Sequence, residues 1–313
     1  MSTDHDTFET QVRAHSRELR VHCYRMTGSF EESEDLVQET FLRAWRKREQ
    51  FAGRASLRAW LYKIATNACL DALDKRPRVP SADGEILWLQ PYPDALLDEV
   101  ATDDEGPDAA VIAKETIELT FITAIQHLAP LPRAVLVLRD VLDLSVRETS
   151  ELLETTEASV NSALQRARAG MREQLGSQRD EWRPPVAPDA VEQKLIQRYL
   201  ELTERADVAG LTELLHDDLR FTMPPIPGIW EGRERVVQSW IDGGFGSETF
   251  GELRCRLTWL NRQPAIAAYI RAPGGDRFEA LTVEVLRFED GLVREIVTFD
   301  GRLAEQLGLP AAL

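Results

Sequence analysis

Two stretches without hydrophobic periodicity divide this chain of 313 residues, and they constrain its fold more than any other feature. Residues 77–110 are rich in Pro, Asp and Gly, and residues 183–188 read Arg-Pro-Pro-Val-Ala-Pro. Pro and Gly interrupt helices and strands, so both stretches favour linkers. The chain is also longer than one ordinary core can organise. The sequence therefore predicts two all-α modules and then, after the Pro-containing hinge, an α+β domain.

The net charge of −16 is unevenly distributed along the chain. Residues 1–80 carry 14 Lys+Arg against 12 Asp+Glu, a net +2, whereas residues 81–114 carry −8. Residues 115–180 carry −3 and residues 181–313 carry −7. Such a protein neutralises few phosphates, so we expect it to bind DNA weakly when alone. A DNA function would need a basic partner or a few locally aimed cations.

Several classes of protein are disfavoured by the sequence. No apolar run approaches the roughly 20 residues that span a bilayer, and the polar, acidic N-terminus does not resemble a signal peptide. Cys23, Cys69 and Cys255 lack the spacing of a metal site or a disulfide framework. We therefore expect a cytoplasmic protein without metal, cofactor or membrane partner, whose cysteines are small buried hydrophobic residues.

The first module contains two helix patterns separated by a short Gly-containing turn. Residues 31–46 begin with acids and are closed by the basic triplet 46–48, which matches the helix dipole. Their apolar stripes cover more than one face, so either both are core or Phe41 and its neighbours face a protein partner. Residues 57–71 form the second pattern, with Arg58, Trp60, Lys63, Asn67 and Asp71 mostly off the core stripe. Cations interleaved with aromatics suit single-stranded DNA, although these residue types alone favour a solvated helix face.

The second module has the spacing of a helix-turn-helix. Helices are expected at 133–141, 145–153 and from about 157 to 171, with a capping box formed by Ser145 and Glu148. Four apolar residues of the last helix recur at core spacing: Val160, Leu164, Ala167 and Met171. The opposite side presents Ser159, Ser162, Gln165, Arg166 and Arg168. Gln and Arg can bind base edges in a major groove, and Ser can bind base or phosphate.

Four blocks in these modules resemble the extracytoplasmic-function sigma factors of bacterial RNA polymerase. Residues 35–45 resemble region 2.2, residues 60–71 resemble regions 2.3 and 2.4, and residues 131–141 and 160–168 resemble region 4. The resemblance implies binding to core RNA polymerase at the β′ clamp helices and the β flap, and to promoter DNA. Many relatives have Arg in place of Ala163, so their −35 sequence preference is not transferred to this chain.

The same resemblance assigns roles to individual residues. The clamp helices would be bound by Asp35, Gln38, Glu39 and Arg43. The −10 element would be bound by a base-capturing loop and the following helix, through Phe51, Gly53, Arg54, Ser56, Asn67 and Asp71. The −35 element would be read by Ser159, Ser162, Gln165, Arg166 and Arg168.

Residues 189–313 resemble the SnoaL-like family, an α+β cone in which a curved sheet encloses a pocket. Trp230, Trp240, Trp259 and Tyr269 are either the lining of a ligand pocket or ordinary core aromatics. His216 follows a predicted helix and fits a solvated histidine, so no catalytic residue is predicted. A buried carboxylate, Glu279 or Glu284, remains as a polar group within the cone.

The sequence thus predicts sigma region 2 at 8–78, an acidic flexible linker at 79–114, sigma region 4 at 115–178 and a SnoaL-like regulatory domain at 189–313. The predicted function is transcription initiation, regulated in cis by the last domain with either sign, and the chain is not expected to be an enzyme. One alternative is a sigma factor fused to a catalytically active or ligand-sensing SnoaL-like domain. Another is a helix-turn-helix regulator that never binds polymerase, but this leaves residues 35–45 unexplained.

Overall fold

The computed structural model describes residues 2–51, 56–98, 117–175 and 190–313. The chain divides into two compact units: residues 1–80, 88–90 and 96–184 form the first, and residues 81–87, 91–95 and 185–313 form the second. The first is helical and the second contains a six-stranded sheet, which confirms the predicted fold class. None of the helices in the described ranges is long and apolar enough to cross a membrane.

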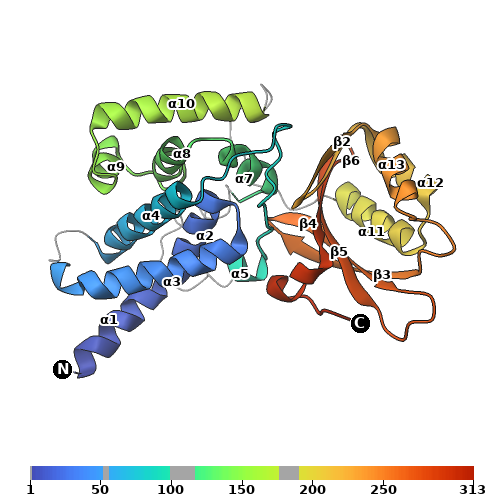
Figure 1. The fold of residues 1–313 in the computed structure, drawn as a ribbon, viewed down its shortest axis with the longest axis horizontal. Coiled ribbons are helices and arrows are strands. Elements are labelled where there is room, and N and C mark those ends of the chain that lie inside the picture. The colour runs from blue at the N-terminus through green and yellow to red at the C-terminus, as the bar shows by residue number, and fades with distance from the viewer. Residues whose placement is uncertain (1, 52–55, 99–116, 176–189) are drawn as a thin grey trace. The chain divides into compact units, whose positions relative to one another are not determined.

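The N-terminal module is a bundle in which α2, α3 and α4 pack against one another (Figure 1). Its elements are α1 (Ser2–Ala14), α2 (Ser16–Thr27), α3 (Phe30–Lys47), the 3-10 turn η1 (Arg48–Gln50) and α4 (Leu57–Lys75). The Ser29 hydroxyl accepts a hydrogen bond from the Glu32 N–H and caps α3. Helix α2 ends at Gly28, whose left-handed backbone (φ 71°) L residues rarely adopt. The predicted helices at 31–46 and 57–71 are confirmed.

The second helical module belongs to the same unit and contains the predicted helix-turn-helix. Its elements are α7 (Leu119–Gln126), α8 (Pro130–Leu136) with the π turn η2 (Val137–Val141), α9 (Val146–Leu152) and α10 (Glu157–Leu175). The capping box is present, because the Ser145 side chain accepts from the Glu148 N–H and the Glu148 carboxylate accepts from the Ser145 N–H. The four residues predicted to form the core of α10 are all buried.

The first part of the acidic linker predicted at 79–114 has a defined structure, unlike the flexible tether that was expected. Residues 81–98 have defined positions, include the short helix α5 (Ala95–Asp98), and bury Ile86, Leu89 and Tyr92. The segment bonds to residues distant in sequence, since the Gln90 N–H donates to the Gly28 carbonyl and the Asn261 N–H donates to the Tyr92 carbonyl. Residues 99–114, where much of the acid lies, are outside the described residues, as is the hinge at 183–188.

The second unit is a sheet whose concave face is covered by helices (Figure 1). Its helices are α11 (Ala190–Glu204), α12 (Val208–Leu214) and α13 (Arg233–Asp242), and its strands are β1 (Leu215–Met223), β2 (Ile226–Glu231), β3 (Glu252–Leu260), β4 (Gln263–Arg271), β5 (Glu279–Glu289) and β6 (Leu292–Asp300), followed by the 3-10 turns η3 (Gly301–Leu303) and η4 (Glu305–Leu307). The strand order is β2-β1-β6-β5-β4-β3, with β1 and β6 parallel and the other neighbours antiparallel. The predicted Asp290-Gly291 hairpin joins β5 to β6, and both residues have positive φ.

Candidate functional site

The residues predicted to bind polymerase lie on successive turns of α3. Asp35 and Gln38 are exposed, and Glu39 and Arg43 are half-buried. The Arg43 guanidinium donates hydrogen bonds to the carboxylates of Glu39 and Asp71, each at 2.7 Å, and these acceptors raise the pKa of Arg43. Asp71 was predicted to lie near the −10 strand. Its carboxylate accepts from Arg43 and joins α4 to α3.

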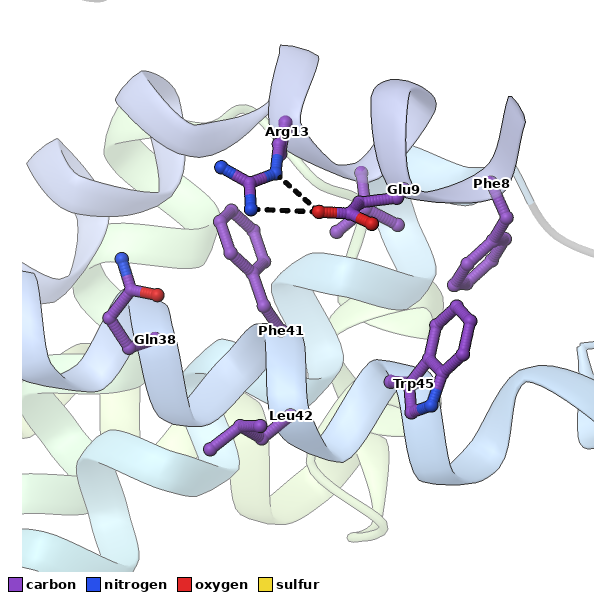
Figure 2. A pocket seen from close by; sticks show the side chains of 8 residues that line it. Phe8, Glu9, Arg13, Gln38, Phe41, Leu42 and Trp45 are labelled. Carbon is purple, nitrogen blue, oxygen red and sulfur yellow. Dashed lines mark hydrogen bonds and ion pairs between the residues drawn. The ribbon is translucent and has the colours of Figure 1, made fainter. Parts of the chain in front are cut away.

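A groove of about 250 Å³ opens between α1 and this part of α3 (Figure 2). Phe8 and Val12 line it from α1, and Gln38, Phe41, Leu42 and Trp45 line it from α3. In Figure 2 the Phe8 ring faces Trp45, with their ring centroids 6.2 Å apart. Leu42 is 53% exposed and Trp45 is 37% exposed. The groove therefore places accessible apolar surface directly beside Gln38.

Two of the predicted −10 residues, Phe51 and Ser56, lie beside the start of α4, where Phe51 packs against Trp60. The Phe51 and Trp60 rings lie 5.1 Å apart, and the Ser56 hydroxyl accepts from the Ala59 N–H and caps the helix. Asn67 is half-buried further along α4. Gly53 and Arg54 lie outside the described residues. A tilted aromatic pair and a helix cap thus lie at the start of α4.

Two cations of α4 have partners that the sequence did not reveal. Arg58 donates to the Glu18 carboxylate at 2.6 Å and stacks over the Tyr62 ring at 5.1 Å. Lys63 lies 3.0 Å from the Glu154 carboxylate, which lowers the pKa of Glu154. Glu18 lies in α2 and Glu154 in the turn between α9 and α10, both far away in the chain, and α4 consequently presents less free positive charge than its sequence indicates.

The predicted −35 residues share the outer side of α10. Ser162, Gln165, Arg166 and Arg168 are exposed, and Ser159 is half-buried. The Arg166 guanidinium donates to the Ser162 hydroxyl at 2.9 Å, which orders two potential base-reading groups side by side. Arg168 donates to both carboxylate oxygens of Asp140, at 2.7 and 2.9 Å, and thereby joins α10 to η2. Ala163 is fully buried, so this position faces the core rather than solvent.

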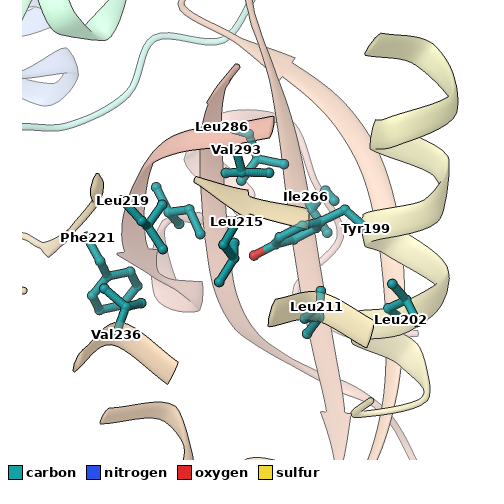
Figure 3. Close-up of a cluster of buried hydrophobic side chains, with 11 residues drawn as sticks. Tyr199, Leu202, Leu211, Leu215, Leu219, Phe221, Val236, Ile266, Leu286 and Val293 are labelled. Atoms are coloured by element: carbon teal, nitrogen blue, oxygen red, sulfur yellow. The ribbon is translucent and has the colours of Figure 1, made fainter. Parts of the chain in front are cut away.

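The concave face of the sheet in the second unit holds an apolar core (Figure 3). The carboxyl group of Glu284 lies on the same face. Glu284 on β5 pairs with Ile266 on β4, and directly opposed residues of paired strands share a face. The Tyr199 hydroxyl from α11 donates to the Glu284 carboxylate at 3.0 Å. Burial raises the pKa of Glu284 to about 7, a shift that the Tyr199 hydrogen bond partly offsets. Glu279, the other candidate, is exposed and paired with Arg277.

The four candidate pocket aromatics do not form one group. Trp230 and Trp240 both pack against Phe221, with centroids at 5.4 and 6.2 Å. Tyr269 lies on the opposite side of β4 from Ile266, because side chains alternate along a strand. Trp259 is half-buried near the end of β3, and its carbonyl accepts from the Asp94 N–H. His216 lies in β1 and its Nδ1 accepts from the Asp218 N–H at 3.0 Å.

Family comparisons agree with this division of the chain. The Sigma-70 region 2 model matches residues 11–79, the Sigma-70 region 4 model matches residues 119–171, and the SnoaL-like domain model matches residues 196–296. The ECF RNA polymerase sigma factor SigG of Mycobacterium tuberculosis is 39% identical over 323 residues, covering 98% of this chain and 85% of SigG. The chain belongs to the extracytoplasmic-function RNA polymerase sigma factors. Sigma factors are transcription initiation factors, so it is not an enzyme.

A further relative, SigJ of Mycobacterium tuberculosis, is similar to this sigma factor over most of its length. SigJ of Mycobacterium tuberculosis is 28% identical over 87% of this chain and 84% of SigJ. The crystal structure of SigJ has a TM-score of 0.63 and 22% identity, covering 96% of this chain and 99% of that structure. The latter similarity shows the shared fold. The sigma factor therefore combines regions 2 and 4 with a C-terminal SnoaL-like domain.

Proposed function

We propose that this sigma factor binds core polymerase through α3, recognises the −10 element from the start of α4, and reads the −35 element from α10. The polymerase contact is supported by the exposed Asp35 and Gln38 beside the apolar groove at Leu42 and Trp45. Such a surface combines a desolvated centre with polar groups at its rim, as protein interfaces do. Because core polymerase is cytoplasmic, the protein acts in the cytoplasm.

Polymerase binding is tested by co-purification with core enzyme. Asp35→Arg combined with Gln38→Ala is expected to weaken binding at least tenfold, because it places a repulsive charge and removes a hydrogen-bonding side chain beside the groove. Arg147→Ala on α9 is the matched control for an exposed helix substitution. Wild-type binding by the folded double variant would exclude α3 as the anchor.

Promoter reading is tested by comparing transcription from single-base variants of the −35 element. Arg166→Ala is expected to relax preference at one base pair, because a lost bidentate contact costs about 1–3 kcal/mol of discrimination. Arg172→Ala, further along the exposed side of α10, is the control. Unchanged preference in Arg166→Ala and in Gln165→Ala would move the reading to Ser159 and Ser162.

We also propose that the SnoaL-like domain regulates the sigma regions in cis, and the path of residues 81–95 supports this. Both Glu85 carboxylate oxygens accept from the Gly228 N–H in the second unit, at 2.8 and 2.9 Å. Asp94 accepts from the Arg262 N–H at 2.9 Å, and Tyr92 exchanges two hydrogen bonds with Asn261. Residues 88–90, between these anchors, belong to the first unit. The SnoaL-like domain thereby holds both flanks of a segment that packs on sigma region 2.

Cis regulation is tested by run-off transcription with core polymerase. Asp94→Ala removes a linker anchor to the SnoaL-like domain, and Asp83→Ala removes the same charge from an exposed linker position. We expect Asp94→Ala to change initiation at least twofold relative to Asp83→Ala. A rise means that the domain restrains the sigma regions, a fall means that it presents them, and equal activity would contradict cis regulation. A small-molecule ligand of the domain remains the alternative, favoured by the buried Glu284 carboxyl group.

A further inference from the structure

The carbonyl groups at the end of α2 are occupied by residues from three separate parts of the chain. The last carbonyls of a helix have no partner within the helix, and the helix dipole makes this end attractive to cations and hydrogen-bond donors. The Arg25 carbonyl accepts from Gln126 Nε2 at 3.0 Å, and the Met26 carbonyl accepts from the Arg133 guanidinium. The Gly28 carbonyl accepts from the Gln90 N–H at 3.0 Å. We call Arg25, Met26 and Gly28 the α2 socket.

Region 4 contacts this socket through the buried guanidinium of Arg133. Arg133 is 1% exposed, and it also donates to Gln126 Oε1 at 2.6 Å and to the Gln126 and Leu128 carbonyls at 2.8 and 2.9 Å. Burial lowers the pKa of Arg133 to about 10, so it stays charged at neutral pH. The contact is tight, because a Cβ on Gly28 would lie 3.0 Å from the Gln126 side chain. A glycine is therefore needed at the socket both for its backbone and for this approach.

The linker occupies the adjacent part of the same turn. Gln90 Oε1 accepts from the Ser29 hydroxyl at 2.7 Å and from the Glu31 N–H at 3.0 Å, so it helps to cap α3. The Tyr24 hydroxyl donates to the Gln90 carbonyl at 2.8 Å. Region 4 and the linker thus bind neighbouring groups of one helix end, and each stabilises the backbone conformation that the other requires.

We propose that the α2 socket is a latch that holds region 4 against region 2 in the free factor, and that Gln90 is the linker's part of that latch. The −10 and −35 elements are about 25 base pairs apart, roughly 85 Å along B-DNA. In the latched arrangement Lys63 of α4 and Glu154 of the helix-turn-helix are 3.0 Å apart. Such a unit cannot place α4 on one element and α10 on the other. Opening of the latch must therefore precede simultaneous reading of both elements. For a partner that binds the open form, the apparent affinity falls in proportion to the fraction of the factor that is open.

The latch is tested by measuring distances in the full chain without polymerase or DNA. Nitroxide labels are placed at Lys75→Cys and Glu173→Cys, both exposed, in a Cys255→Ser background. The buried Cys23 and Cys69 stay unlabelled in the folded protein. We expect a single narrow distance for the parent protein, and a longer, broad component after Arg133→Lys, because an ammonium cannot serve the socket and the carbonyls of Gln126 and Leu128 together. Losing one such charge-assisted hydrogen bond shifts the closed-to-open ratio by about tenfold.

Matched variants separate the latch from the folding of region 4. Arg139→Lys is the control, since Arg139 donates to the Leu144 carbonyl inside region 4, and it should leave the distance unchanged. Gln90→Leu should broaden the distance through the linker side. If Arg133→Lys does not fold, Lys63→Glu decides: it should lengthen the distance, and Glu154→Lys should restore it. A broad distance in the parent protein, or no change in both Arg133→Lys and Lys63→Glu, would overturn the latch.

The effect on transcription rests on the proposed promoter contacts, whereas the distance measurement does not. A latch confirmed by distances, with no change in promoter reading by Arg166→Ala, would leave the latch standing and overturn the promoter assignment. A change in promoter reading by Arg166→Ala, with distances that contradict the latch, would overturn the latch and leave the promoter assignment standing.

Discussion

Arg133 and Glu284 are both buried charged residue types, and their surroundings differ in a way that separates the two units. Arg133 is surrounded by carbonyl oxygens of Met26, Gln126 and Leu128 and by the Gln126 amide oxygen. Glu284 lies among apolar side chains, with the Tyr199 hydroxyl as its donor. Burial lowers the pKa of Arg133 to about 10 and raises that of Glu284 to about 7. The helical unit is thus joined by a permanent charge, whereas the core of the second unit holds a charge that titrates near neutral pH.

The largest expected effect comes from removing the permanent charge. Arg133→Ala leaves several buried carbonyls without a donor and creates a cavity, so it should lower the free energy of unfolding by more than about 3 kcal/mol. Urea unfolding of the full chain, followed by circular dichroism at a helical wavelength, measures the change. A loss below that of Arg139→Ala would mean that the socket contributes little stability.

The second prediction concerns the titrating charge and its pH dependence. At pH below about 4.5 the Glu284 carboxyl is protonated in both the folded and the unfolded chain and affects neither. Between about 4.5 and 7 the unfolded chain ionises first, so the free energy of unfolding falls as pH rises, by up to about 3 kcal/mol in total. Glu284→Gln should abolish this component. Urea unfolding of both proteins from pH 5 to pH 8 tests it, and parallel pH profiles would contradict the burial of an ionisable group there.

The smallest effect is expected from the hydrogen-bond donor of Glu284. Tyr199→Phe removes a group that lowers the pKa of Glu284, so that pKa should rise further. The free energy of unfolding should fall by about 1 kcal/mol, and by more at pH 8 than at pH 5. In a Glu284→Gln background the pH dependence of this loss should vanish. A pH-independent loss in both backgrounds would show that the Tyr199 hydroxyl does not act on this carboxyl.

The sequence was sufficient for elements whose signals are local. The capping box at Ser145, the buried stripe of α10 and the Asp290-Gly291 hairpin each depend on residues within one or two turns of one another. The identification of sigma regions 2 and 4 and of a SnoaL-like domain followed from motif blocks, and family comparison confirms that identification. Periodicity, caps and turn residues are therefore readable without knowledge of the tertiary structure.

Contacts between distant residues could not be read in this way. Arg133 follows two prolines and has the sequence context of a surface residue, but its partner Met26 precedes it by 107 residues. Asp71 and Arg168 fit DNA-contacting positions, but Arg43 and Asp140 bind their side chains. Residues 81–97 contain Pro, Asp and Gly, and this composition led us to expect a flexible segment. The segment is held by single residues such as Gln90 and Asp94, and a single residue leaves no repeating pattern in the sequence. Tertiary partners determined these outcomes.

Hydrogen exchange can show whether the linker couples the SnoaL-like domain to the α2 socket. The Gln90 amide donates to the Gly28 carbonyl, while Asp94, four residues later, binds the β3–β4 turn of the second unit. In the full chain, Asp94→Ala should speed exchange at the Gln90 amide and around Gly28 at least tenfold, with Asp83→Ala as control. If exchange at the β3–β4 turn accelerates in Asp94→Ala while Gln90 and the α2 socket keep wild-type protection, the two anchors are independent and the coupling is contradicted.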